Sequence, residues 1–168
     1  MRVAVTGTPG TGKTTATERL DTDLDVIHLN DVIRSEGFST GTDEERGSLV
    51  ADMDALETWL DGREDAIVES HLAHNFDADR VVVLRAHPDT VVSRLRERGD
   101  SDSKAYENAE SEALDVILSE AVHHHGRDCV YEIDTTDRDP EAVAAEIAAV
   151  VEGEREPSAG TVSYVDWL

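Results

Sequence analysis

A glycine-rich loop in the first fourteen residues constrains this chain most. The segment Gly7-Thr-Pro-Gly-Thr-Gly-Lys-Thr14 fills every fixed position of the G-x-x-x-x-G-K-S/T phosphate-binding loop. Residues 3–5 before it suit a buried parallel strand, and residues 13–20 after it suit a helix. The N–H groups of such a loop and of the helix start converge on phosphate oxygens. The N-terminal stretch therefore predicts a site for a nucleoside triphosphate.

Each residue type in this loop has a chemical reason. Glycine at Gly10 and Gly12 lets the backbone adopt positive φ and approach an anion closely. Lys13 supplies a mobile positive charge for the β and γ oxygens, and the Thr14 hydroxyl is placed to coordinate Mg²⁺. We therefore expect a nucleoside triphosphate with Mg²⁺ to bind here, with Gly10, Gly12, Lys13, Thr14 and Thr15 as contacts.

The charge of the chain limits the classes of partner that it can bind. It has 38 acidic residues against 15 lysines and arginines, a net charge of -23 that repels nucleic acid and anionic membranes, so we expect no direct DNA binding. Lys13 and Lys104 are the only lysines, and aromatic residues make up 4%. This composition resembles the proteomes of salt-accumulating archaea, where molar salt screens self-repulsion. An acidic face that docks a basic partner is the alternative, and the two can coexist.

Length and cysteine content indicate one domain in a reducing compartment. A chain of 168 residues can bury a core of ordinary size. The single cysteine, Cys129, excludes an internal disulfide and lies in an apolar run, so we expect it in the core. The sequence shows no signal-type run and no apolar stretch of membrane-spanning length. A soluble, cytoplasmic protein is the expectation.

Strand-like and helix-like segments alternate along the chain. Apolar runs predict strands at 3–5, 26–29, 66–70, 80–85 and 129–133, and helical spacing predicts helices at 13–20, 30–36, 48–60, 88–98, 104–125 and 140–151. Residues 38–47 and 99–103 are predicted as loops, the first of them mobile. This alternation predicts a P-loop α/β three-layer sandwich with a five-stranded parallel sheet.

The third predicted strand ends in polar residues. The carboxyl ends of parallel strands meet at the ligand crevice, so Glu69 and His71 should lie beside the phosphate loop. Glu69 is expected to hold Mg²⁺ through water together with Thr14, and His71 to orient a water or the substrate. The alternative is a polar strand end in which both residues serve only the structure.

Two further groups of polar residues can reach phosphates. Arg94, Arg96 and Arg98 precede a glycine, and Lys104 follows it, so a mobile segment can bring cations over a transferring phosphoryl group. We expect one or two of them to reach the ligand, with Arg98 favoured over the alternative of a solvated helix face.

The second group lies on the helix after the second predicted strand. Asn30, Asp31 and Arg34 occur there, and Arg34 can bind the phosphate of an acceptor nucleotide with two parallel hydrogen bonds. The alternative is an exposed arginine paired with Glu36 or Asp31.

Taken in order, these motifs resemble a known family. They are the phosphate loop, the Asn-Asp-x-x-Arg run from Asn30, the Glu-x-His run from Glu69, Leu84-Arg85, Arg94-Leu-x-x-Arg98-Gly99, Glu107-Asn108 and Glu112. Over residues 1 to about 150 the chain resembles the isoenzyme-six type of adenylate kinase. The chain departs from that pattern at Glu69, where the family usually has Asp, and at Asp100, where an aromatic residue often follows the glycine.

The resemblance implies a nucleoside monophosphate kinase with ATPase activity. It also implies a role in small-subunit rRNA maturation through one basic platform ribosomal protein, the eleventh. By analogy, residues 1–151 form the kinase domain, 28–51 the monophosphate-binding region and 97–107 the lid, in which Arg98 meets ATP. Arg138 would lie near the adenine, and residues 152–168 form a tail that packs onto the domain or docks a partner.

The motifs and the resemblance together predict transfer of the γ-phosphate of ATP to AMP or a related monophosphate. Lys13 and Arg98 would stabilise the transferring charge, and Arg34 would position the acceptor. One rival is an ATPase switch in ribosome assembly, in which His71 orients water and the acidic surface docks a basic protein. Another is a kinase for a different small metabolite, because residues 38–47 are too generic to define the acceptor.

Overall fold

The computed structural model describes residues 1–43 and 48–168. Their strands are β1 (Arg2–Thr6), β2 (Asp25–His28), β3 (Ser39–Asp43), β4 (Ser48–Ala51), β5 (Ala66–Glu69), β6 (Arg80–Arg85) and β7 (Val130–Asp134). The α-helices are α1 (Lys13–Thr17), α2 (Leu29–Glu36), α3 (Met53–Leu60), α4 (Pro88–Glu97), α5 (Asp102–Ala113), α6 (Val116–His125) and α7 (Pro140–Val151). Short 3₁₀ turns are η1 (Ala73–Asn75), η2 (Arg127–Cys129) and η3 (Val165–Trp167).

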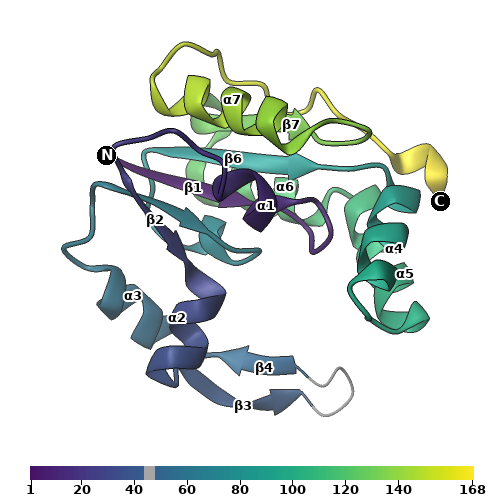
Figure 1. Cartoon of the computed structure of the whole chain (residues 1–168), viewed down its shortest axis with the longest axis horizontal. Helices are drawn as coiled ribbons and strands as arrows, with labels where there is room; N and C mark the ends of the chain where they lie inside the picture. Colours follow the sequence, from purple (N-terminus) through teal and green to yellow (C-terminus); the bar gives the residue numbers. More distant parts are fainter. Residues whose placement is uncertain (44–47) are drawn as a thin grey trace.

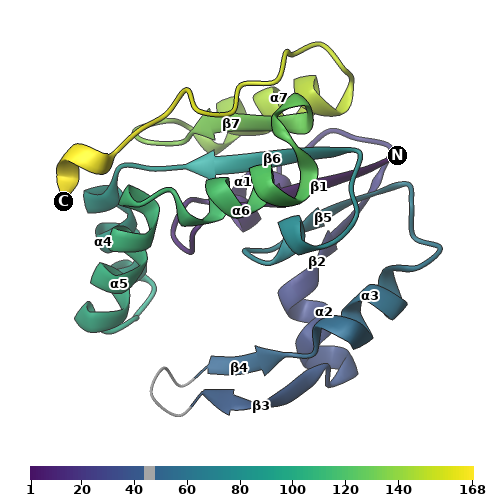
Figure 2. The same cartoon turned by 180° about the vertical axis from the view of Figure 1, so that it is seen from behind.

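Five parallel strands form the central sheet, in the order β2-β5-β1-β6-β7. Helices α1 and α7 cover one face and α6 covers the other (Figures 1 and 2). Successive side chains of β1 alternate between the two layers, with Val3 and Val5 facing α7 and Ala4 facing α6. The predicted three-layer sandwich with a five-stranded parallel sheet is confirmed.

The segment after α2 differs from the prediction. Residues 39–43 and 48–51 form an antiparallel hairpin, β3–β4, where a loop and the first turn of a helix were expected; residues 44–47 of that predicted loop lie outside the described residues. Helix α3 begins only at Met53, because the Asp52 carboxylate caps it by accepting from the Ala55 N–H at 3.1 Å. Leu49 and Val50 fit a helical pattern, yet they lie on the hairpin and are 52% and 45% exposed.

The predicted long helix at 104–125 is broken into α5 and α6. Asp115 lies between them with φ of 56°, in the left-handed region, and its carboxylate pairs with the buried Arg85 at 2.6 Å. This ion pair outweighs the helical propensity of the surrounding sequence. Helix α5 also starts earlier than predicted, at Asp102, because the Ser101 hydroxyl accepts from the Lys104 N–H.

The C-terminal tail packs back onto the domain, as Figure 1 shows for the yellow segment that crosses to α4 and α5. The Thr161 N–H donates to Glu132 at 2.7 Å, and the Trp167 indole packs on the α4–α5 core while its N–H donates to Asp89. Cys129 is only half-buried, in η2 just before β7, so its expected core position is wrong. No helix in the described ranges is both long and apolar enough to cross a membrane.

The break at Asp115 gives a stability prediction. Asp115→Asn keeps a side chain that tolerates left-handed backbone but removes one carboxylate from Arg85, so unfolding free energy should fall by about 1–2 kcal/mol. Asp115→Ala should lose about 1 kcal/mol more, because alanine is strained at this φ. Urea unfolding in molar KCl measures both, with exposed Asp128→Asn as the control. Wild-type stability of Asp115→Asn would contradict the proposed cause of the break.

Candidate active site

The phosphate loop lies between the end of β1 and the start of α1, as the motif predicts. Gly10 and Gly12 have φ of 94° and 87°, both in the left-handed region. Gly7 is equally constrained, since a Cβ atom there would lie 2.6 Å from the carbonyl oxygen of Leu84 on β6. These close approaches require glycine and turn the loop around a concavity in front of α1.

Lys13 is buried at the base of this concavity. Its Nζ donates to the Thr8 carbonyl at 3.2 Å, and the residue is 8% exposed. Burial lowers the pKa of Lys13 from 10.5 to about 8, against the opposing effect of the Glu69 charge. The amine is therefore still protonated at pH 7 and poorly solvated. An anion that enters the concavity would compensate this buried charge.

Thr14 and Glu69 meet beside the loop. The Thr14 hydroxyl donates to Glu69 Oε1 at 2.9 Å, and His28 Nδ1 lies 2.8 Å from the same oxygen. Hydroxyl and carboxylate oxygens are the ligands that Mg²⁺ prefers, so this pair fits the metal that kinases use. The contact from His28 was not predicted, although His28 ends β2, whose carboxyl end meets the same edge of the sheet.

His71 follows β5 and lies near the buried lysine. Burial, and then the charge of Lys13, lower the pKa of His71 to about 4, with smaller effects from other cations that include Arg98 and Lys104. The imidazole is therefore neutral at pH 7 and has a nitrogen free to accept a hydrogen bond from water. Asn30 joins this edge through its Oδ1, which accepts from the Ser70 hydroxyl at 3.0 Å.

A cavity of about 320 Å³ opens on the other side of the phosphate loop. Its lining includes Gly12 and Thr15 from the loop and α1, Arg94 from α4, and Arg138 with Val143 from the last turn and helix. The volume and mixed lining suit a nucleoside. Arg138 is anchored in this lining by its hydrogen bonds to Glu146 at 2.5 Å and to the Asp134 carbonyl at 3.2 Å.

Of the three arginines at 94, 96 and 98, Arg94 contacts the phosphate loop. The Arg94 guanidinium donates to the Gly10 carbonyl at 3.2 Å and to Thr135 Oγ1 at 3.1 Å, which ties the phosphate loop to the turn after β7. Arg98 is 57% exposed and paired with Asp100 at 2.6 Å, although its charge acts on Lys13. Spacing alone cannot tell which of these arginines faces inward.

Two other predicted arginines lie at the surface. Arg34 is 72% exposed and lies 3.7 Å from Asp31, which is the surface pairing that the sequence left open. The structure therefore does not bring Asp31 and Arg34 to the phosphate loop. Asn30 of the same helix, by contrast, contacts Ser70 at the end of β5. Arg96 pairs with Asp102 at 2.8 Å and lies over the Tyr106 ring, outside the crevice.

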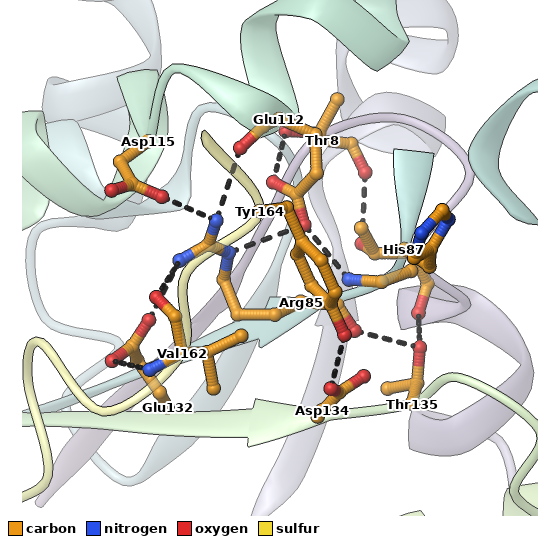
Figure 3. Close-up of polar contacts among 12 residues, drawn as sticks. Thr8, Arg85, His87, Glu112, Asp115, Glu132, Asp134, Thr135, Val162 and Tyr164 are labelled. Atoms are coloured by element: carbon orange, nitrogen blue, oxygen red, sulfur yellow. Dashed lines mark hydrogen bonds and ion pairs between the residues drawn. The ribbon is translucent and has the colours of Figure 1, made fainter. Parts of the chain in front are cut away.

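A buried ion cluster supports the loop from below (Figure 3). Arg85, fully buried at the end of β6, contacts Glu112 at 3.2 Å, Asp115 at 2.6 Å and Glu132 at 2.7 Å. Burial opposes its charge, but these carboxylates outweigh burial and raise the pKa of Arg85. Glu112 also accepts from the Thr8 hydroxyl at 2.9 Å, so the cluster reaches the phosphate loop. From the sequence, Arg85 and Glu112 are motif residues, but no role was predicted for this cluster.

This chain is similar to known proteins over its full length. Residues 3–115 match a family model described as an AAA domain. Proteins named "Putative adenylate kinase" from Natronomonas pharaonis and Halobacterium salinarum are each 65% identical to it, with 100% of both chains covered. One from Methanothermobacter thermautotrophicus is 43% identical over 99% of this chain and 98% of its own. The chain belongs to this adenylate kinase family. The first two relatives come from halophilic archaea, consistent with the acidic composition.

Solved structures agree with the family in fold. Shikimate kinase from Acinetobacter baumannii, in complex with shikimate, superposes with a TM-score of 0.61 at 15% identity, covering 92% of this chain and 94% of that one. Deoxyadenosine kinase from M. mycoides superposes with a TM-score of 0.58 at 15% identity, covering 92% and 100%. At this identity the similarity establishes a shared P-loop kinase fold alone.

The burial of Lys13 predicts that this residue lowers the stability of the fold while it supports ATP turnover. Lys13→Met should abolish ATP turnover, yet raise the free energy of unfolding at pH 7 by up to about 3 kcal/mol, because the fall in pKa from 10.5 to about 8 measures the cost of burying the charge. The unfolded chain holds the proton up to pH 10.5, so the gain is complete below pH 8 and disappears as the pH rises to 10.5.

Urea unfolding in molar KCl at pH 7 and pH 10 measures this gain. Lys104→Met, which changes the other lysine of the chain, is the matched control and should leave stability almost unchanged. A Lys13→Met protein that is less stable than the wild type at pH 7 would overturn the description of Lys13 as a poorly solvated charge.

Proposed function

We propose that this protein transfers the γ-phosphate of Mg²⁺-bound ATP to AMP or a related nucleoside monophosphate. The observation that carries the proposal is the position of the buried Lys13, with a nucleoside-sized cavity on one side and the Thr14–Glu69 pair on the other. The names of the full-length relatives support a nucleotide kinase.

The donor would bind across the phosphate loop. Its phosphates would accept from the loop N–H groups and from Lys13, while the nucleoside occupies the cavity beside Thr15 and Arg138. Arg94 ties this cavity to the Gly10 carbonyl, so nucleoside binding and loop geometry depend on one side chain. In this arrangement Gly12 and Lys13 would both contact the triphosphate.

Thr14 and Glu69 would hold the metal, directly or through water. Bound Mg²⁺ supplies positive charge to the β and γ oxygens of the donor. His28 keeps one Glu69 oxygen engaged, so the longer side chain that replaces the family's usual aspartate stays fixed beside Thr14. His28 thereby compensates for the extra methylene.

The acceptor would bind on the α2 side of the crevice, near Asn30. Exposed ion pairs such as Arg34–Asp31 and Arg98–Asp100 contribute little stability, so a phosphate can replace the carboxylate in each. Arg34 would then bind the acceptor phosphate, and Arg98 would reach the transferring group. An acceptor oxygen attacks the γ-phosphorus, the bond to the bridging oxygen of ADP breaks, and catalysis rests on positioning and charge.

A second candidate is an ATPase switch in small-subunit rRNA maturation, which the family resemblance implies. The neutral His71 beside Lys13 favours it, because an uncharged imidazole can accept a hydrogen bond from an attacking water. The net charge of -23 would complement a basic platform ribosomal protein. In that reading, transfer to AMP is incidental.

A coupled assay in molar KCl with Mg²⁺-ATP separates the two candidates. ADP formation should rise at least about 10²-fold when AMP is added, with two ADP formed per AMP consumed, because the acceptor oxygen replaces water as the nucleophile. Other monophosphates, and no acceptor, are run in parallel. Phosphate release that does not respond to AMP would contradict the kinase proposal and favour the ATPase switch.

Two variants serve as internal controls. Lys13→Met should lose both activities, which ties the signal to this site. Arg34→Ala should raise the KM for AMP about 10-fold or more and leave the KM for ATP nearly unchanged, since it lies on the acceptor side. An equal effect on both constants would remove Arg34 from the acceptor site.

A further inference from the structure

Lysine is rare in this chain, and its two positions converge on one place. Of the 15 lysines and arginines, only Lys13 and Lys104 are lysines; the others are arginines. Lys13 lies at the base of the phosphate loop. Lys104 lies on α5, two turns before Glu112, which contacts Thr8 of the same loop. Both lysines therefore lie on elements that border the phosphate loop.

The helix that carries Lys104 presents it to the crevice. Lys104 is in the first turn of α5, which is fixed by the Ser101 hydroxyl that accepts its N–H. Ala105 and Ala109 on the same helix are buried against α4, and Glu112, two turns further on, contacts Thr8 of the phosphate loop. Lys104 precedes Glu112 by eight residues, so the two lie on the same side of α5. The Lys104 side chain is half-buried there.

The Lys104 ammonium makes no hydrogen bond or ion pair with any residue in the described ranges 1–43 and 48–168. Its neighbours on the α4–α5 hairpin differ, since Arg96 pairs with Asp102 and Arg98 pairs with Asp100. A cation without a partner is unexpected in a chain with 38 acidic residues. A half-buried ammonium that has no partner among the described residues is the arrangement that a polyanion would complete.

We propose that Lys104 is a further catalytic residue, which binds the terminal phosphate of the donor opposite Lys13. This inference rests on the proposed phosphoryl transfer. A lysine suits the position because its compact charge and three rotatable donors can follow the phosphoryl group as its oxygens move. Two lysines on opposite sides would place positive charge over the equatorial oxygens without any covalent step.

Binding of inorganic tripolyphosphate, followed by calorimetry, tests the contact without any requirement for turnover. Lys104→Ala should weaken the affinity about 10-fold, because one charge-assisted hydrogen bond is lost. Lys104→Arg should restore most of it. Arg96→Ala is the matched control, since it removes a cation from the same hairpin that already has a carboxylate partner, and it should bind as the wild type does.

Transfer kinetics on the same proteins complete the test. Lys104→Ala should lower kcat/KM for ATP about 10²-fold while Arg96→Ala does not. Tripolyphosphate affinity and kinetics of Lys104→Ala within about 3-fold of the wild type would overturn the inference. A wild-type protein that binds tripolyphosphate but transfers nothing to AMP would overturn the proposed function, and the binding result would still decide the role of Lys104.

Discussion

The buried guanidinium of Arg85 is the interaction on which the rest of the structure depends. It lies within the apolar interior with three carboxylates, from Glu112, Asp115 and Glu132, and loss of Arg85 would leave these carboxylates without their shared cation. These partners come from α5, from the break before α6 and from β7. One charge on β6 therefore determines where the α4–α5 hairpin joins the sheet.

The same cluster extends to the functional edge of the molecule. Glu112 accepts from Thr8, so the phosphate loop is anchored to the hairpin that carries Lys104. Glu132 also accepts from the tail at Thr161, which closes the cluster from solvent on its other side. A rigid loop matters because Lys13 has been desolvated beneath it. A preorganised, poorly solvated cation favours a phosphate more strongly than a mobile, solvated one does.

The sequence predicted the sheet and the phosphate loop because both are encoded locally. Continuous apolar runs identify buried parallel strands, and a motif with fixed spacing identifies the loop. The predictions from sequence were wrong where contacts between residues far apart in the chain determine the local structure. Leu49 and Val50 have helical spacing, but pairing with residues 41 and 42 places them in a hairpin. Asp115 ends a helix because Arg85, thirty residues away, binds its carboxylate. Arg94 likewise faces inward because its guanidinium donates to Thr135.

The claim that the buried cluster holds the phosphate loop is tested most directly by the dissociation constant of Mg²⁺-ATP for Thr8→Val. This change keeps the shape of the side chain and removes only its hydrogen bond to Glu112. Thr17→Val is the control, since among the described residues that buried hydroxyl bonds only within α1. The account predicts a dissociation constant about 10-fold higher for Thr8→Val and unchanged for Thr17→Val. Equal, wild-type affinity in both variants would contradict it.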